Sequence, residues 1–138
     1  MKGIKVSNSE QTTAALGVNY ELMKGLRLGI DGRFSGRQYA DYDIASQAIK
    51  ANKNNPVVDL VQPWRIPAAY TFDANISYSF KIGNVDAVWR ANCNNLFNEA
   101  YITRALDNGA KTGGHDWNDA TVFYGFGRTW MMSMRVKF

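Results

Sequence analysis

Residues 128–138, read as RTWMMSMRVKF, alternate almost without a break between apolar and polar side chains. One parity carries Trp130, Met132, Met134, Val136 and Phe138. The other parity carries Thr129, Ser133, Arg135 and Lys137, with Met131 as its one apolar member. Alternation with a period of two over this length predicts a β-strand with one apolar and one polar face. A closing strand of this kind is typical of outer-membrane barrels, whose strands face lipid on one side.

The same alternation returns in four other stretches of the chain. Residues 13–22 place Ala14, Leu16, Val18, Tyr20 and Leu22 on one face, and residues 26–37 do the same with Leu26, Leu28, Ile30 and Phe34. From Tyr70 to Ile82, every even-numbered residue is apolar and every odd-numbered one is polar. Residues 85–97 follow with Val85, Ala87, Trp89, Ala91, Cys93 and Phe97 on one parity. The chain is therefore predicted to be all-β, with five long antiparallel strands in a meander.

The connections between these strands alternate in length. Two tight turns are expected at Lys24-Gly25 and Gly83-Asn84, whereas long loops are expected at about 38–69 and 98–127, after a polar lead-in at 1–12. Strands of about ten residues exceed the five or six that are usual in soluble proteins, and match the nine to eleven that cross a bilayer. Aromatic residues gather towards the strand ends, as in interfacial girdles. These features favour a transmembrane β-barrel over a soluble antiparallel sandwich.

Four segments together resemble the C-terminal end of the barrel of TonB-dependent outer-membrane receptors, especially those of Bacteroidetes-type bacteria. They are ALGVNYELMKGLRLGIDGRFSGRQYADYD, TFDANISYSFKIG, WRANCNNLFNEAYI and FYGFGRTWMMSMRVKF, and they occur in this order from about Thr13 onward. Within the third segment, NNLFNEAY resembles the penultimate-strand motif of that family. The resemblance implies that residues 13–138 are the C-terminal part of a transmembrane β-barrel.

The resemblance also implies a function and a set of partners. Receptors of this family lie in the outer membrane and import scarce ligands, such as siderophores, cobalamin or glycans. Their barrel is closed by a plug, through which the TonB complex supplies energy. The implied partners are therefore outer-membrane lipid, the barrel-assembly machinery, the plug and earlier strands of the receptor, and the TonB complex. No cofactor is implied. Phe138, with Val136 and Met134, is expected to carry the signal that the assembly machinery reads.

Five strands cannot close a lipid-facing barrel, because an open edge in hydrocarbon leaves backbone groups unsatisfied. The N-terminal residues MKGIKVSNSEQTT contain no apolar core of a secretory signal. We therefore expect the chain to be a piece of a longer receptor that does not transport anything alone. The end of a passive porin and a soluble all-β binding module remain as alternatives.

The second predicted loop contains the side chains that are candidates for ligand contact. Trp117, Phe123 and Tyr124 lie in or beside it and could contact a ligand or mark the outer membrane interface. The only histidine, His115, could join the loop carboxylates in binding a metal, and Asp107, Asp116 and Asp119 could offer oxygens to Ca²⁺. Their spacing matches no standard metal loop. A solvated polar loop without a metal is the expectation.

Charged residues are interleaved with apolar ones along the strands. The net charge of +4 is not gathered into the basic run of a nucleic-acid binder, so no nucleic-acid partner is predicted. The arginines on the polar faces of the predicted strands could guide an anionic ligand, or could pair across neighbouring strands with Asp31, Asp73 and Asp86. These arginines are Arg27, Arg33, Arg37, Arg90 and Arg135.

No catalytic motif is present in the chain. Neither GxSxG nor HExxH occurs, and no convincing pair of acids is found, so the protein is not expected to be an enzyme. The single Cys93 excludes an internal disulfide and a cysteine-based zinc site. Because Cys93 falls on the apolar parity of its strand, we expect a packed or lipid-facing thiol rather than a nucleophile.

Overall fold

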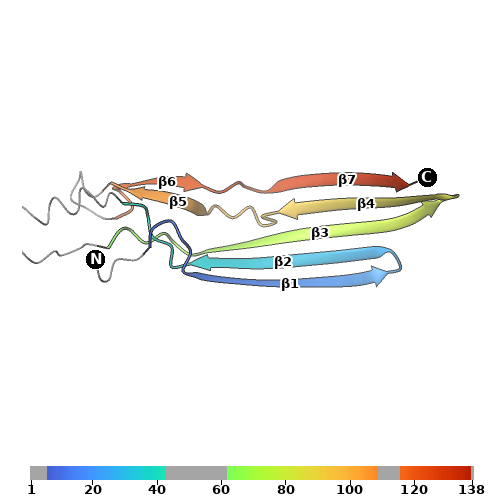
Figure 1. Ribbon diagram of the computed structural model, residues 1–138, viewed down its shortest axis with the longest axis horizontal. Helices are drawn as coiled ribbons and strands as arrows, with labels where there is room; N and C mark the ends of the chain where they lie inside the picture. Colours follow the sequence, from blue (N-terminus) through green and yellow to red (C-terminus); the bar gives the residue numbers. More distant parts are fainter. Residues whose placement is uncertain (1–5, 43–61, 109–115, 138) are drawn as a thin grey trace, which may run out of the picture. The chain divides into compact units, whose positions relative to one another are not determined.

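The computed structural model describes residues 6–42, 62–108 and 116–137, and within them every regular element is a β-strand. The strands are β1 (Thr12–Met23), β2 (Leu26–Gly36), β3 (Ala69–Ile82), β4 (Val85–Asn94), β5 (Ile102–Asp107), β6 (Ala120–Tyr124) and β7 (Thr129–Lys137) (Figure 1). The prediction of an all-β chain with antiparallel sheets is confirmed. No helix in the described ranges is long and apolar enough to cross a membrane.

Some sequence predictions lie outside the described residues. They include the assembly-signal residue Phe138, the histidine His115, and residues 1–5 of the polar lead-in. Residues 43–61 of the first predicted loop and 109–115 of the second lie outside them as well.

Five strands form one sheet in the order β1-β2-β3-β4-β7. Neighbouring strands run in opposite directions (Figure 1). The sheet is open in the described part of the chain, with β1 and β7 as its two edge strands, so no closed barrel is formed by these residues. Two-residue turns join the strands at one end of the sheet, where Gly25 and Gly83 supply the positive φ values of 86° and 60°.

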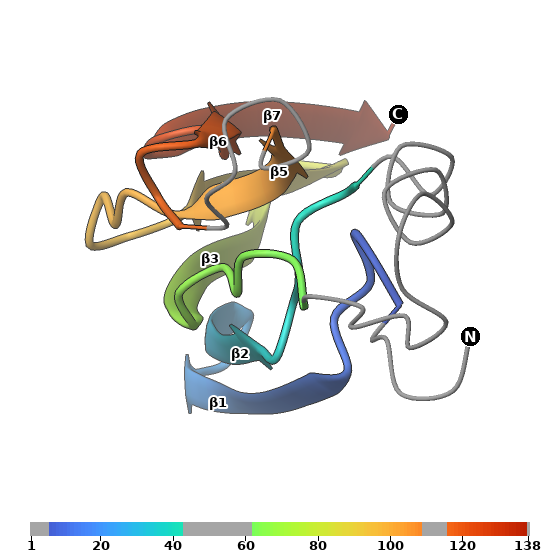
Figure 2. The same ribbon diagram turned by 90° about the vertical axis from the view of Figure 1, so that its left-hand side faces the viewer.

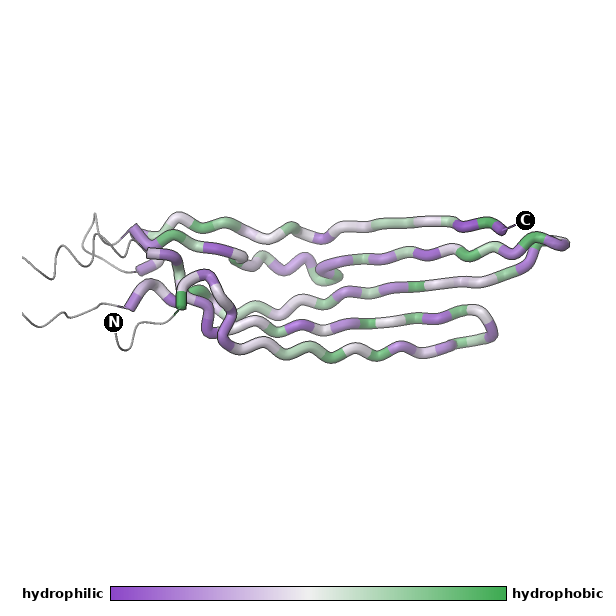
Figure 3. Tube along the Cα trace, viewed as in Figure 1, coloured by the Kyte–Doolittle hydropathy of each residue, from purple (hydrophilic) through white to green (hydrophobic). Residues whose placement is uncertain are grey.

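The register between β3, β4 and β7 places like side chains in rows. Ile76, Ala91 and Met132 form one row, and Tyr78, Trp89 and Met134 form the next. The rows of opposite parity are mainly polar, such as Ser77, Arg90 and Ser133, with Val88 and Met131 as apolar members. Since successive side chains of a strand point to opposite faces, the sheet has one apolar and one polar face. Figure 3 shows the corresponding alternation of hydrophobic and hydrophilic positions along the strands.

The chain divides into two compact units. The sheet unit comprises the described residues of 14–34, 70–100 and 126–137, and the loop unit comprises those of 6–13, 35–69 and 101–125. The two predicted loops therefore contribute to one folded body. The expectation of a strandless loop over 98–127 is wrong, because β5 and β6, both labelled in Figure 2, lie within it and pair antiparallel (Figure 1).

The loop unit has its own small core. Ala40, Ile66 and Ala105 are fully buried, and Trp64, Ile102 and Val122 pack against them. Residues 38–41 lie between two neighbouring segments: Ala40 donates to the carbonyl of Trp64 at 2.8 Å, and Asp41 donates to that of Ala105 at 2.7 Å. A third bond, from the Gln38 side chain to the Thr103 carbonyl, measures 2.8 Å. Backbone pairing on both sides fixes this segment within the unit.

Candidate functional site

The apolar face of the five-stranded sheet carries large side chains that remain exposed. Leu16 on β1 is 77% exposed, Met132 on β7 is 66% exposed, and Trp130 on the same strand is 62% exposed. Further exposed members of this face are Val18, Tyr20, Leu22, Ile30, Tyr70, Tyr78, Met134 and Val136. Soluble monomers rarely expose a continuous apolar surface of this extent. The face therefore needs an apolar environment that the described residues do not supply.

Small side chains are the ones buried on this face. Ala87 is 1% exposed, Ala91 is 7% exposed and Cys93 is 2% exposed, all three on β4. Ala87 lies in register between the larger Phe80 and Val136, and Ala91 between the larger Ile76 and Met132, whereas Cys93 lies between Ala74 and Trp130. On this face the small side chains are buried and the large apolar side chains are exposed, whereas the core of a soluble protein buries its large apolar side chains. The thiol of Cys93 is buried in the sheet, as the sequence predicts for a packed thiol.

Aromatic rings occupy both ends of the apolar face and aliphatic residues occupy its middle. Near the long connections, the rings of Phe34 and Tyr70 lie 4.8 Å apart. Near the tight turns, the rings of Tyr78 and Phe80 stack at 5.1 Å. On the apolar face of β3, Phe72 follows Tyr70 as the last ring of the first group. The aliphatic residues Ala74 and Ile76 then separate it from Tyr78 and Phe80. Two aromatic belts around an aliphatic band are typical of a surface that crosses a bilayer.

The length of the strands fits the thickness of a bilayer. β1 has 12 residues and β3 has 14. At about 3.3 Å per residue, twelve residues rise about 40 Å. Tilted by about 45°, such a strand spans about 28 Å, close to the hydrocarbon thickness of about 30 Å. A strand made only to cover a soluble core is usually about half as long.

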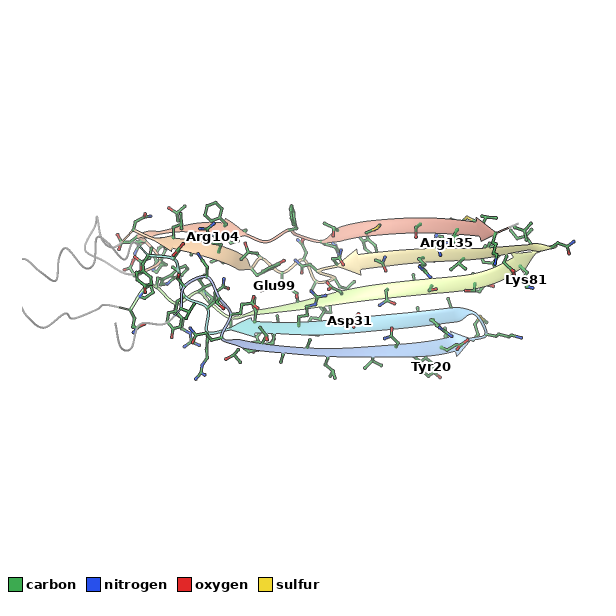
Figure 4. The ribbon with its side chains drawn as sticks, viewed as in Figure 1. Tyr20, Asp31, Lys81, Glu99, Arg104 and Arg135 are labelled. Carbon is green, nitrogen blue, oxygen red and sulfur yellow. The ribbon has the colours of Figure 1, made fainter. Side chains whose placement is uncertain are left out.

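The polar face of the sheet holds ion pairs and amide contacts between neighbouring strands. The guanidinium of Arg33 on β2 lies 3.7 Å from the carboxylate of Asp73 on β3. Arg27 pairs with Glu21 at 3.7 Å, and Lys81 pairs with Asp86 at 3.4 Å. Of the predicted arginine partners, Asp73 is confirmed, whereas Asp86 pairs with a lysine and Asp31 accepts from the Asn75 side chain at 3.5 Å. Figure 4 labels Asp31 on this face.

A turn at the end of β4 joins three parts of the sheet unit. The backbone N–H of Asn95 donates to the carboxylate of Asp73 at 2.9 Å. The side-chain amide of Asn95 donates to the carbonyls of Glu99 at 2.8 Å and Phe126 at 3.3 Å, while its oxygen accepts from the Glu99 N–H at 2.8 Å. Asn95 is buried. This side chain therefore fixes the end of β4 to β3 and to the segment that enters β7.

Asn98 completes this turn, which we name the asparagine turn (residues 95–98). Its side-chain oxygen accepts from the backbone N–H of Arg128 at 2.9 Å, immediately before β7. Asn95 and Asn98 have positive φ values of 52° and 56°, a conformation that asparagine tolerates better than most residues. The turn ends β4 at Asn94, so the prediction of a strand that continues to Phe97 is wrong. Sequence reasoning noticed the NNLFNEAY motif but missed the role of its asparagines.

The candidate ligand-contact residues lie on the surface of the loop unit. Trp117 precedes β6 and is 69% exposed, and Phe123 and Tyr124 are exposed on β6. Phe123 lies opposite Arg104, whose guanidinium is 3.4 Å from the carboxylate of Asp41. Tyr124 follows directly and lies opposite Ile102. Because consecutive strand residues point to opposite faces, Phe123 and Tyr124 do not share one contact surface on β6.

The acidic residues proposed for Ca²⁺ have separate roles. The buried carboxylate of Asp107 accepts from the backbone N–H of Trp64 at 2.8 Å. That of Asp116 accepts from the N–H of Asn118 at 2.8 Å, within a local turn. Among the described residues no group of three or more histidine, cysteine or acidic side chains is placed to hold a metal.

Two of the residues that the sequence predicts to carry an assembly signal are described by the structure, and both lie on the apolar face of β7. Met134 pairs with Trp89 and Val136 pairs with Ala87. Both side chains are exposed on this edge strand. The outer side of β7 has no partner strand in the described residues, so its backbone is available for pairing with a further strand.

Neither a protein-family model nor a curated protein sequence is significantly similar to the chain.

Proposed function

We propose that the chain is the C-terminal barrel segment of a TonB-dependent outer-membrane receptor that takes up a scarce ligand. In this proposal the apolar face of β1, β2, β3, β4 and β7 contacts outer-membrane lipid, and the polar face lines the barrel interior. The tight turns lie on the periplasmic side. The segments that form the loop unit lie outside the cell. The plug and the remaining strands belong to other parts of the receptor, and the TonB complex acts through the plug.

One observation carries the lipid-facing part of the proposal: large apolar side chains of β1, β2, β3 and β7 are exposed on one face of the sheet, and β4 contributes small buried residues between them. A single sheet with neither face packed is not a stable soluble architecture, because a sheet normally buries one face against another layer. If the apolar face lies against a bilayer, that face is removed from water, and the polar face can remain solvated. The two aromatic belts and the strand length support lipid over a second protein layer.

The receptor assignment depends on the order of the four segments that resemble the family, and the loop unit is consistent with it. Long connections that fold into a body of their own, with exposed aromatic residues, are suited to contact a ligand outside the membrane. Trp117, Phe123 and Tyr124 are the residues that we propose for such contact, with Phe123 and Tyr124 acting on opposite faces of β6. Met134, Val136 and Phe138 are proposed as the assembly signal, because Met134 and Val136 lie on the edge strand that must pair during closure and Phe138 belongs to the same alternating stretch of sequence.

The reading frame upstream of the Met1 codon tests the receptor assignment. We expect in-frame codons for further alternating strands, preceded by a plug and a signal peptide. Alternating strands without a plug would replace the receptor by a passive porin. A stop codon and a ribosome-binding site directly upstream would contradict both, and would favour a self-sufficient sheet that is soluble or covered by a partner.

A further inference from the structure

Two arginines on the polar face of the sheet have no ion-pair partner among the described residues. They are Arg90 on β4 and Arg135 on β7, whereas Arg27 and Arg33 on the same face are each paired with a carboxylate. Arg90 lies opposite Ser133, two residues before Arg135. The two arginines are therefore diagonal neighbours on adjacent strands, with Cα atoms about 7–8 Å apart, which long side chains bridge easily.

Hydrogen-bond donors flank Arg90 on both sides, Val88 lies directly opposite Arg135, and acceptor-only groups are scarce among the described residues nearby. Arg90 lies between Ser77 on β3 and Ser133 on β7, so a hydroxyl flanks it on each side. Towards the turn end of the face lie Lys81, Asp86 and Lys137 in one row. Among the described residues of β3, β4 and β7, Asp86 is the only acidic side chain in this part of the face, and Lys81 already holds it at 3.4 Å. Figure 4 labels Lys81 and Arg135 towards this end of the sheet.

We infer that Arg90 and Arg135, with the hydroxyls of Ser77 and Ser133, form a binding site for a phosphate group. Two guanidinium groups offer more N–H donors than the two oxygens of one carboxylate accept, whereas the oxygens of a phosphate use donors from both arginines and both serines. The described side chains of this region, four cationic and one acidic, also match a doubly charged anion better than a singly charged one. The inference depends on the sheet register and does not require the lipid-facing proposal.

Protection of arginines from phenylglyoxal tests this site. The chain is refolded in a non-ionic detergent, treated with the reagent in chloride or in inorganic phosphate at equal ionic strength, and digested. Mass spectrometry then gives the modification rate of each arginine separately. We expect phosphate to slow modification of Arg90 and Arg135 several-fold and to leave Arg27 and Arg33 unchanged. The last two are matched controls, because they are exposed arginines on the same face.

Two variants and a second anion serve as controls for this experiment. Arg90→Gln should abolish the protection of Arg135, while Arg33→Gln should leave it intact, and both replace exposed side chains of the sheet. Equal protection of all four arginines would reduce the effect to general screening and overturn the inference. So would the absence of protection. Protection by acetate as strong as that by phosphate would overturn the assignment to a phosphate group.

Discussion

Met132→Arg is expected to lower the stability of the chain in detergent micelles by about 2–4 kcal/mol, the cost of an arginine at the middle of a lipid-facing strand. Met132 lies in the central aliphatic row beside Ala91 and Ile76. If this row faces the apolar part of a micelle or bilayer, a guanidinium there must lose its water or distort its surroundings. Urea unfolding followed by circular dichroism measures the change in free energy.

Met131→Arg is the matched control for this prediction. Met131 is the same residue type one position earlier, and its exposure of 60% is close to the 66% of Met132. It lies on the polar face, opposite Asn92. The same substitution should therefore change the stability by less than about 0.5 kcal/mol, as surface substitutions usually do. Equal losses for the two variants would contradict the assignment of one face to lipid and the other to water.

Asn95→Ala is expected to destabilise the sheet unit by about 2–4 kcal/mol. The substitution removes three part-buried hydrogen bonds, in which the Asn95 side chain donates to the carbonyls of Glu99 and Phe126 and accepts from the Glu99 N–H, and a typical intramolecular hydrogen bond contributes about 0.5–1.5 kcal/mol. It also places alanine at a positive φ of 52°, which costs about 1–2 kcal/mol. Hydrogen exchange of the Glu99 amide and of the first β7 amides should accelerate, because the turn fixes the entry to β7.

Two further substitutions separate these causes. Asn95→Gly removes the same hydrogen bonds but accepts the positive φ, so it should recover about 1 kcal/mol relative to Asn95→Ala. Asn94→Ala removes one exposed bond to the Thr129 hydroxyl, of 3.2 Å, and should cost less than about 0.5 kcal/mol. If Asn94→Ala and Asn95→Ala were equally harmful, the asparagine turn would not have the role assigned to it.

The sequence predicted the long strands well because alternation with a period of two extends over their whole length. In β3, all positions from Tyr70 to Ile82 obey it, and the structure places a strand at Ala69–Ile82. The division into an apolar and a polar face followed directly, including the position of Met131 as the apolar exception on the polar face. The pairing of Arg33 with Asp73 could also be predicted from the sequence, because both residues fall on the polar face of their strands.

The strands of the loop unit could not be predicted in the same way. β5 has six residues and β6 has five, which is too short for a clear periodic signal. A register irregularity between Ile102 and Arg104 also places the core residues Ile102 and Ala105 on different sequence parities. The asparagine turn was missed because its bonds connect residues as distant as Asn98 and Arg128, which no local pattern reveals.

The exposure of the tryptophans to detergent tests the central claim, that the apolar face of the sheet contacts lipid. Trp130 lies on that face and Trp117 in the loop unit, and they are similarly exposed, at 62% and 69%. Two variants, each retaining one of these residues with the other tryptophans changed to phenylalanine, are refolded in a brominated non-ionic detergent. Bromine quenches only tryptophans in contact with the detergent chains. We expect strong quenching of Trp130 and weak quenching of Trp117.

One result would contradict the claim that the apolar face contacts lipid. If the chain folds in plain buffer as a monomer with a cooperative melt, and Trp130 is quenched no more than Trp117, then the apolar face is covered by protein and does not contact lipid.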